Sequence, residues 1–136
     1  MKYEYLPHTA DAKFRAFGKD IEEVFRNSAI AMFDILGKTE EVKVTKRKTI
    51  KIKAKNLEAL LYDFLEEILI LLDTEGIFIH DVKKIKISDE FELTAVIEGD
   101  DLNNYDLSGD IKAVTYNDMS IKKTNNRYEA TVVVDI

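Results

Sequence analysis

The sequence contains no cysteine, which excludes disulfide bonds, thiolate zinc sites and cysteine nucleophiles. It has one proline and five scattered glycines, and no G-x-G-x-x-G or phosphate-cradling motif, so nucleotide binding by those routes is not expected. The longest nearly unbroken apolar stretch, residues 68–72, is far below the roughly 20 residues of a membrane-spanning helix. Residues 1–5 show no signal-peptide pattern. These absences predict a soluble, cytoplasmic protein that does not engage a membrane.

What is present is the composition of one globular domain. The 136 residues are 46% hydrophobic, enough for a core that needs no disulfide or metal. Neither a linker nor a repeat interrupts the chain, so a single domain is predicted over 1–136. The net charge of −6 disfavours a protein whose main role is to bind nucleic acid.

Two segments have the periodicity of amphipathic helices. Asp20, followed by Glu23, predicts a capped helix whose apolar residues run to Leu36, where Gly37 ends it. Asn56 caps a second helix, with apolar residues from 57 to 72 and Gly76 at its end. Because the later half of this helix is apolar almost all round, it is expected to be the most buried element.

The remaining periodic segments alternate as strands do. They cover residues 13–17, 42–55, 77–79, 82–87, 91–98, 111–116, 119–122 and 128–136, with turns at 88–90 and 124–126. The predicted fold class is therefore α+β, with two helices packed on a mostly antiparallel β-sheet.

The sequence contains no recognisable catalytic constellation. His8 and His80 lack the spacing partners of a zinc site, and no serine has an activating motif. The acidic loop 100–106 places Asp106 and Lys112 where an EF-hand requires glycine and glutamate, so it is interpreted as a solvated loop.

A basic stretch occupies the segment 42–55 and has two interpretations. Its cations are Lys43, Lys46, Arg47, Lys48, Lys51, Lys53 and Lys55. They could meet phosphates or an acidic partner, but no aromatic residue is interleaved to stack bases. A solvated outer face of a strand is the favoured interpretation.

Three features remain as candidates for function. They are His8-Thr9-Ala10-Asp11, the strand 111–116 carrying Lys112, and the apolar terminal strand that ends in Asp135-Ile136. If the last strand lies beside the start of the chain, Asp11, Asp135 and the carboxylate of Ile136 converge. Converging carboxylates repel unless a cation lies among them, and all-oxygen ligation favours calcium or magnesium over zinc. From the residues alone, carboxylates that are neutralised by Lys112, or simply exposed, explain the pattern equally well.

These three motifs resemble the archease family. The resemblance implies a non-catalytic protein cofactor of the GTP-dependent, RtcB-type tRNA-splicing ligase, which promotes ligase guanylylation and multiple turnover. Indirect contact with tRNA, through the ligase, is expected. The resemblance also implies a divalent-metal site at Asp11, Asp135 and Ile136, with calcium as the expected ion and magnesium as the alternative, and a basic residue at Lys112. A chaperone-like modulator of tRNA-modifying enzymes is the older description of the family.

One position departs from the family pattern, and one rival function stays open. Many members carry histidine directly after the tyrosine of the K-A-V-T-Y strand, where this chain has Asn117. A titrating or metal-binding role at this position is therefore not expected here. The rival is a small metal-dependent hydrolase that uses Asp11 and Asp135 as its metal or acid–base pair.

Overall fold

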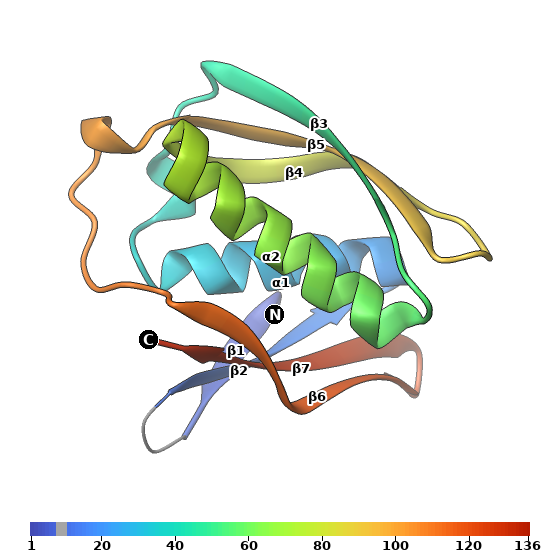
Figure 1. Cartoon of the computed structure of the whole chain (residues 1–136). Coiled ribbons are helices and arrows are strands. Elements are labelled where there is room, and N and C mark those ends of the chain that lie inside the picture. Colours follow the sequence, from blue (N-terminus) through green and yellow to red (C-terminus); the bar gives the residue numbers. More distant parts are fainter. Residues whose placement is uncertain (8–10) are drawn as a thin grey trace.

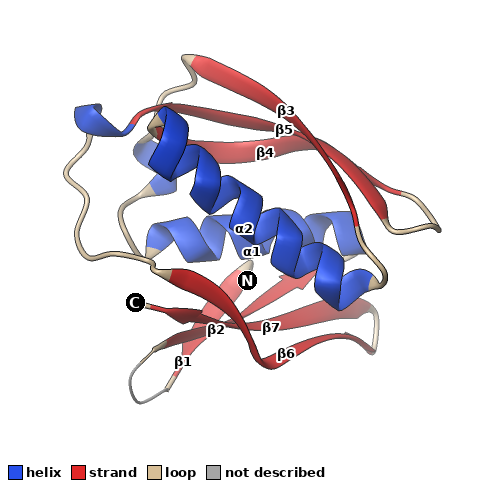
Figure 2. Cartoon of the chain, in the orientation of Figure 1, coloured by secondary structure: helices blue, strands red, loops and turns tan. Residues whose placement is uncertain are grey.

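The chain folds into three layers, in which two helices lie between two antiparallel sheets (Figure 1). The computed structural model describes residues 1–7 and 11–136. The predicted α+β class is confirmed, but the strands divide into two sheets, one on either side of the helices (Figure 2). The second helix is apolar almost all round, so a single sheet would leave part of it in water.

Sheet A has four strands in the order β1-β2-β7-β6. Their bounds are Tyr3–Leu6, Ala12–Gly18, Arg127–Asp135 and Ala113–Thr124 respectively. The sequence did not predict β1, which is short and is tied to the first helix by the Tyr3 hydroxyl donating to Asp34 and the Tyr5 hydroxyl donating to the Ala31 carbonyl. Strand β6 joins two segments that were predicted as separate strands.

Sheet B has three strands in the order β3-β5-β4, with bounds Lys46–Lys53, Glu92–Asp101 and Ile77–Ile87. Strand β4 also joins two predicted strands. Its register against β5 shifts between Ile79 and Asp81 and again between Lys83 and Lys86. Each shift moves side chains to the other face, which breaks the period-2 pattern that sequence reasoning relies on.

Both helices begin where their caps predict, and α2 also ends where predicted, whereas α1 ends at Asp34, before the predicted Leu36 and Gly37. Helix α1, Ile21–Asp34, starts where the Asp20 carboxylate accepts from the amide of Glu23 at 2.8 Å. Helix α2, Leu57–Glu75, starts at the equivalent contact from Asn56 and ends at Gly76, whose φ of 66° is the left-handed cap that favours glycine. Two short 3₁₀ helices, η1 (Thr39–Glu41) and η2 (Leu102–Asn104), lie in the connections.

One core fills the space between the layers. Its largest fully buried side chains are Phe14, Phe25, Phe33, Phe64, Phe78, Met32, Leu60, Leu61, Leu65, Ile68, Ile79 and Leu93, which come from both sheets and both helices. Among the described residues, no helix has the length and apolar content needed to cross a membrane. The core covers the inner faces of both sheets and leaves their outer faces at the surface.

Candidate functional site

The candidate residues from the two halves of the chain meet at one end of sheet A. Strand β2 begins there opposite the end of β7, with Ala12 paired to Val134. Strand β6 begins on the other side of β7, with Ala113 paired to Asp135, and the amide of Lys112 donates to the Asp135 carbonyl at 2.7 Å. Asp11 directly precedes the first paired residue of β2, so the backbone brings it level with Asp135 across the ladder.

This convergence follows from the central place of β7 in the sheet. Residues Val132, Val133 and Val134 are fully buried, and hydrogen-bonded ladders hold β7 on both sides. β-branched residues suit such a strand, because they pack on both faces of the pleat. The end of β7 is therefore fixed in position, although chain segments near an end are commonly frayed.

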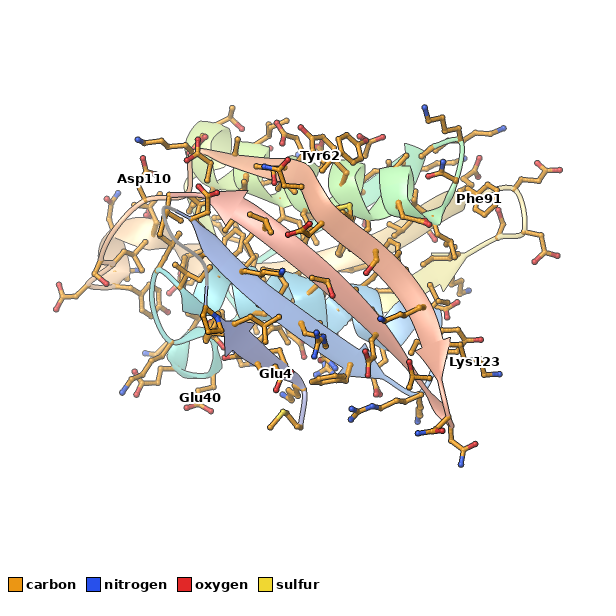
Figure 3. The ribbon with its side chains drawn as sticks, turned by 90° about the horizontal axis from the view of Figure 1, so that it is seen from below. Glu4, Glu40, Tyr62, Phe91, Asp110 and Lys123 are labelled. Atoms are coloured by element: carbon orange, nitrogen blue, oxygen red, sulfur yellow. The ribbon has the colours of Figure 1, made fainter. Side chains whose placement is uncertain are left out.

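The register also assigns a face to each carboxylate. Phe14 and Val132 pair and lie in the core, so Lys13 and Val133, which are also paired, face outward. Alternate residues of a strand face the same side, so Asp11, two residues before Lys13, and Asp135, two residues after Val133, belong to the outer side. Figure 3 looks onto this outer face, with β6, β7, β2 and β1 side by side. Asp135 is half-buried and Ile136 is 44% exposed, so the end of the sheet is reachable from solvent.

The donor chemistry of this end fits a hard divalent ion. Carboxylate oxygens at Asp11, Asp135 and Ile136 would form the all-oxygen set that calcium and magnesium take. Among the described residues, no three histidine, aspartate or glutamate side chains are grouped to hold a metal, so the two aspartates do not suffice by themselves. The predicted ligand set would take its third carboxylate from Ile136, and this stays a prediction.

Lys112 contributes to this end through its backbone. Its side chain is exposed, and no hydrogen bond or ion pair between described residues includes its ammonium group. The backbone bond to Asp135 instead fixes where β6 starts relative to β7. Lys112 therefore has an ammonium group directed to solvent beside the site.

Residues 116–119 of β6 form a strap over the outer face of β7, which was not predicted from the sequence. These four residues stand opposite the single residue Val132, between the pairs Thr115–Val133 and Ser120–Thr131. The Asp118 carboxylate reaches across β7 to the Lys13 ammonium at 3.3 Å, and the left-handed φ of 55° at Asp118 makes this turn possible. The strap explains why Val133 is fully buried although it faces outward. The only sequence signal was the polar pair Asn117-Asp118 between two apolar segments.

The same irregularity places an aromatic pair on the surface. Tyr116 stacks on Tyr62 of α2, with ring centroids 4.2 Å apart and planes 6° from parallel. Tyr116 is 56% exposed, and burial followed by the negative charge of Asp63 raises its pKa. The predicted site did not include these rings, because only the fold brings α2 against β6.

Two other sequence features have clear outcomes. Residues His8, Thr9 and Ala10 of the first motif lie outside the described residues. The amide of Asn117 donates to the Thr115 hydroxyl at 3.3 Å, which is a turn contact.

The prediction of a solvated acidic loop is wrong for its first residue. Asp100 is only 5% exposed and accepts hydrogen bonds from Thr45, Tyr105, the Asp101 amide and Asn104. These bonds, with that of Thr45 the largest, hold the pKa of Asp100 well below its usual range. Asp100 therefore has a structural role, anchoring the end of β5 to the segments on either side of it.

Comparison with known proteins matches nearly the whole length of the chain. The model of the Archease protein family matches residues 3–136. This chain belongs to the archease family. Protein archease of Methanosarcina barkeri is 41% identical over 99% of this chain and 96% of its own, and that of Pyrococcus abyssi is 36% identical over 99% of each.

Two solved structures share the archease fold. The solution structure of Methanobacterium thermoautotrophicum protein 1598 has a TM-score of 0.85 and 35% identity, covering 99% of both chains. The crystal structure of an archease from Thermotoga maritima, described as a possible chaperone, has a TM-score of 0.63 and 23% identity over 96% of this chain and 94% of that one. The second likeness supports the fold alone.

Proposed function

We propose that this archease is a non-catalytic activator of a GTP-dependent tRNA-splicing RNA ligase, and that the carboxylate end of sheet A is its working site. One observation carries the proposal: β7 brings Asp11, Asp135 and Ile136 from opposite ends of the chain to one accessible edge. Membership of the archease family supports the choice of partner.

The site would hold one calcium or magnesium ion through Asp11, Asp135 and the carboxylate of Ile136. When bound, such an ion neutralises negative charge that develops on phosphoryl oxygens of the partner's nucleotide. The chain's own residues supply the position: the β2–β7 ladder sets the spacing of the aspartates, and the amide of Lys112 holds the Asp135 backbone. The chain lacks a recognisable nucleophile, so the chemical step belongs to the ligase.

A guanylylation assay of the ligase tests this function. Asp135→Asn and Asp11→Asn keep side-chain size and remove one charge each, and each is expected to reduce stimulation at least tenfold. Asp89→Asn, in the exposed β4–β5 turn, is the matched control and should stimulate like the parent. Equal stimulation by all three variants would remove the proposed role of the site.

Incubation of the isolated chain with RNA, nucleotides and magnesium separates the activator from the rival hydrolase. No turnover is expected. Cleavage that disappears in Asp11→Asn would assign the same carboxylates to an enzyme instead.

The metal itself has an independent readout in thermal stability. Calcium that binds the folded chain at a hundred times its Kd stabilises by about 2.7 kcal/mol. One glycine added after Ile136 displaces the carboxylate and should remove most of this calcium-dependent shift. One glycine added before Met1, which is 86% exposed, should leave the shift unchanged.

A further inference from the structure

The outer face of sheet B gathers cations from two strands that are far apart in the sequence. In β3, Ile50 faces the core, so Arg47, Lys51 and Lys53 alternate to the outside. In β4, Lys83 pairs in register with Val96 and Lys86 with Thr94, on the same outer side of the sheet. We call the face formed by Arg47, Lys51, Lys53, Lys83, Lys84 and Lys86 the basic face.

A shallow hollow lies within this face. It has a volume of about 530 Å³ and is lined by Thr49, Thr94, Lys84 and Lys86 together with the apolar residues Ile85, Ala95 and Val96. Lys84 lies in the second register shift of β4 with a φ of 53° and is one of the residues that line the hollow. The hollow therefore combines two threonines and two lysines with an apolar floor.

Few carboxylates neutralise the basic face. The middle strand β5 contributes Glu98, which pairs with Arg47 at 3.1 Å, and Glu92, which pairs with Lys51 at 3.4 Å. Asp81, at the edge of β4, pairs with Lys83 at 3.2 Å.

Three lysines of the basic face are left without such partners. In the described part of the chain, no ion pair includes Lys53, Lys84 or Lys86. These three lysines, called open because they have no ion-pair partner, make this face locally positive, although the protein as a whole has a net charge of −6.

We propose that the basic face binds the phosphate backbone of RNA without reading its sequence. The two rows of cations are separated by one strand, which places them about 10 Å apart, and the threonine hydroxyls between them can donate to phosphate oxygens. No residue assigned to this face is aromatic, so bases have no stacking platform. The choice of RNA as the polyanion rests on the proposed function, because the partner ligase acts on tRNA.

The composition of the face favours phosphates over an acidic protein surface. Five of its six cations are lysine, a compact point charge that suits phosphate and is depleted in protein–protein interfaces. The basic face and the carboxylate end of sheet A lie on opposite sides of the helix layer (Figure 1). Bound RNA would therefore leave the carboxylate end free for the ligase.

Fluorescence anisotropy of a labelled RNA hairpin with the chain alone tests the proposal, with no ligase present. Raising the salt from about 50 to 200 mM should weaken binding more than tenfold, as expected for about three phosphate contacts. The variant Lys53→Gln/Lys84→Gln/Lys86→Gln should lose at least tenfold in affinity and most of its salt dependence. The charge-matched control Lys19→Gln/Lys38→Gln/Lys122→Gln, on other exposed surfaces, should bind like the parent.

Three outcomes would overturn the proposal: no binding by the parent at low salt, equal loss in both triple variants, or displacement of the RNA by polyglutamate of matched charge. The last would make the basic face a protein-docking surface. Melting curves confirm that each variant is folded. Because the assay omits the ligase, a failure of guanylylation stimulation does not affect its result, and a failure to bind RNA does not affect the proposed activator site.

Discussion

The outer faces of the two sheets differ in how many of their cations have a carboxylate partner. On sheet A, Arg15 of β2 pairs with Glu4 of β1 at 3.1 Å and lies 3.9 Å from Glu129 of β7. Lys13 is matched by Asp118 of the strap. On sheet B the carboxylates are fewer than the cations, and three lysines of the basic face stay open.

The two sheets also differ in the position of their carboxylates. Sheet B holds its most protected carboxylates at its margins, where Asp81 forms two bonds of 2.7 and 2.8 Å with Arg26 of α1, and Asp100 is enclosed by four donors. Sheet A carries its acids among its own cations on the outside. On sheet A the two cations of β2, Lys13 and Arg15, have carboxylate partners, whereas sheet B presents three open lysines across its surface.

The largest expected effect comes from breaking the ion pair between Arg26 of α1 and Asp81 of sheet B. Arg26→Met leaves Asp81, whose side chain is 8% exposed, without its bidentate partner. The free energy of unfolding should fall by about 2–3 kcal/mol, below the value for a fully buried pair because the Arg26 side chain is 33% exposed. Urea unfolding measures the loss, and Arg26→Lys should recover only part of it. A loss below about 0.5 kcal/mol would mean that the pair contributes little.

The next effect is a loss of folding stability at low pH, which comes from Asp81 and Asp100 of sheet B. Burial alone would raise the pKa of Asp81, but hydrogen bonds from Arg26, the Val82 amide and Lys83 lower it, and the pKa of Asp100 is also lowered. A lowered pKa in the folded state contributes stability above the unfolded pKa of about 3.9 and loses it as the pH falls through the folded value.

Asp100→Asn tests this dependence. The variant should be less stable than the parent at pH 7, and the difference should shrink as the pH falls below about 4. Asp106→Asn, at an exposed position of the same loop, is the control and should track the parent at every pH. A difference for Asp100→Asn that is constant with pH would contradict the assignment.

A smaller effect compares one cation from each sheet. Arg15→Gln removes two partners on sheet A and should cost about 1 kcal/mol. Lys86→Gln on sheet B removes no ion pair with a described residue and should change stability by less than about 0.5 kcal/mol. Denaturant midpoints at low and high salt measure both, and only the Arg15 effect should weaken with salt. Equal costs would remove the contrast between the two faces.

The smallest expected effect is the coupling across the strap. Lys13→Met and Asp118→Asn form a double-mutant cycle, and asparagine tolerates the left-handed backbone at position 118. The coupling should be about 0.5 kcal/mol, because the Asp118 side chain is 61% exposed. Hydrogen exchange at the amide of Val133 should rise in either single variant. Unchanged exchange would mean that the strap stays closed without its ion pair.

The elements were predictable from sequence wherever one period held along the whole segment. Caps and glycines located both helices, and Lys51 and Lys53 alternating with Ile50 and Ile52 located β3. The two sheets were not predictable, because pairings such as Phe14 with Val132 join residues more than a hundred positions apart. Bulges caused the misreading of β4 and β6 as separate strands, since the pattern changes phase at each one.

The candidate site was predictable in part. The sequence showed an apolar strand ending in Asp135, and the register places Asp11 level with it. Coordination of a metal there stays a prediction. The strap and the stacked pair of Tyr62 and Tyr116 were not foreseeable, because each depends on how far β6 departs from regular pairing.

The place of β7 in sheet A also fixes an order of events during synthesis. Residues 12–18 pair with residues 128–134, so β2 leaves the ribosome long before its partner exists. Sheet B and both helices come from the intervening chain and can associate first, while the β1–β2 hairpin waits with an unpaired edge. Such long-range pairing is slow, and an unsatisfied strand edge is prone to pair with other chains. The pairing of β7 with β2 is therefore the step that covers this strand edge and removes it as a site of aggregation.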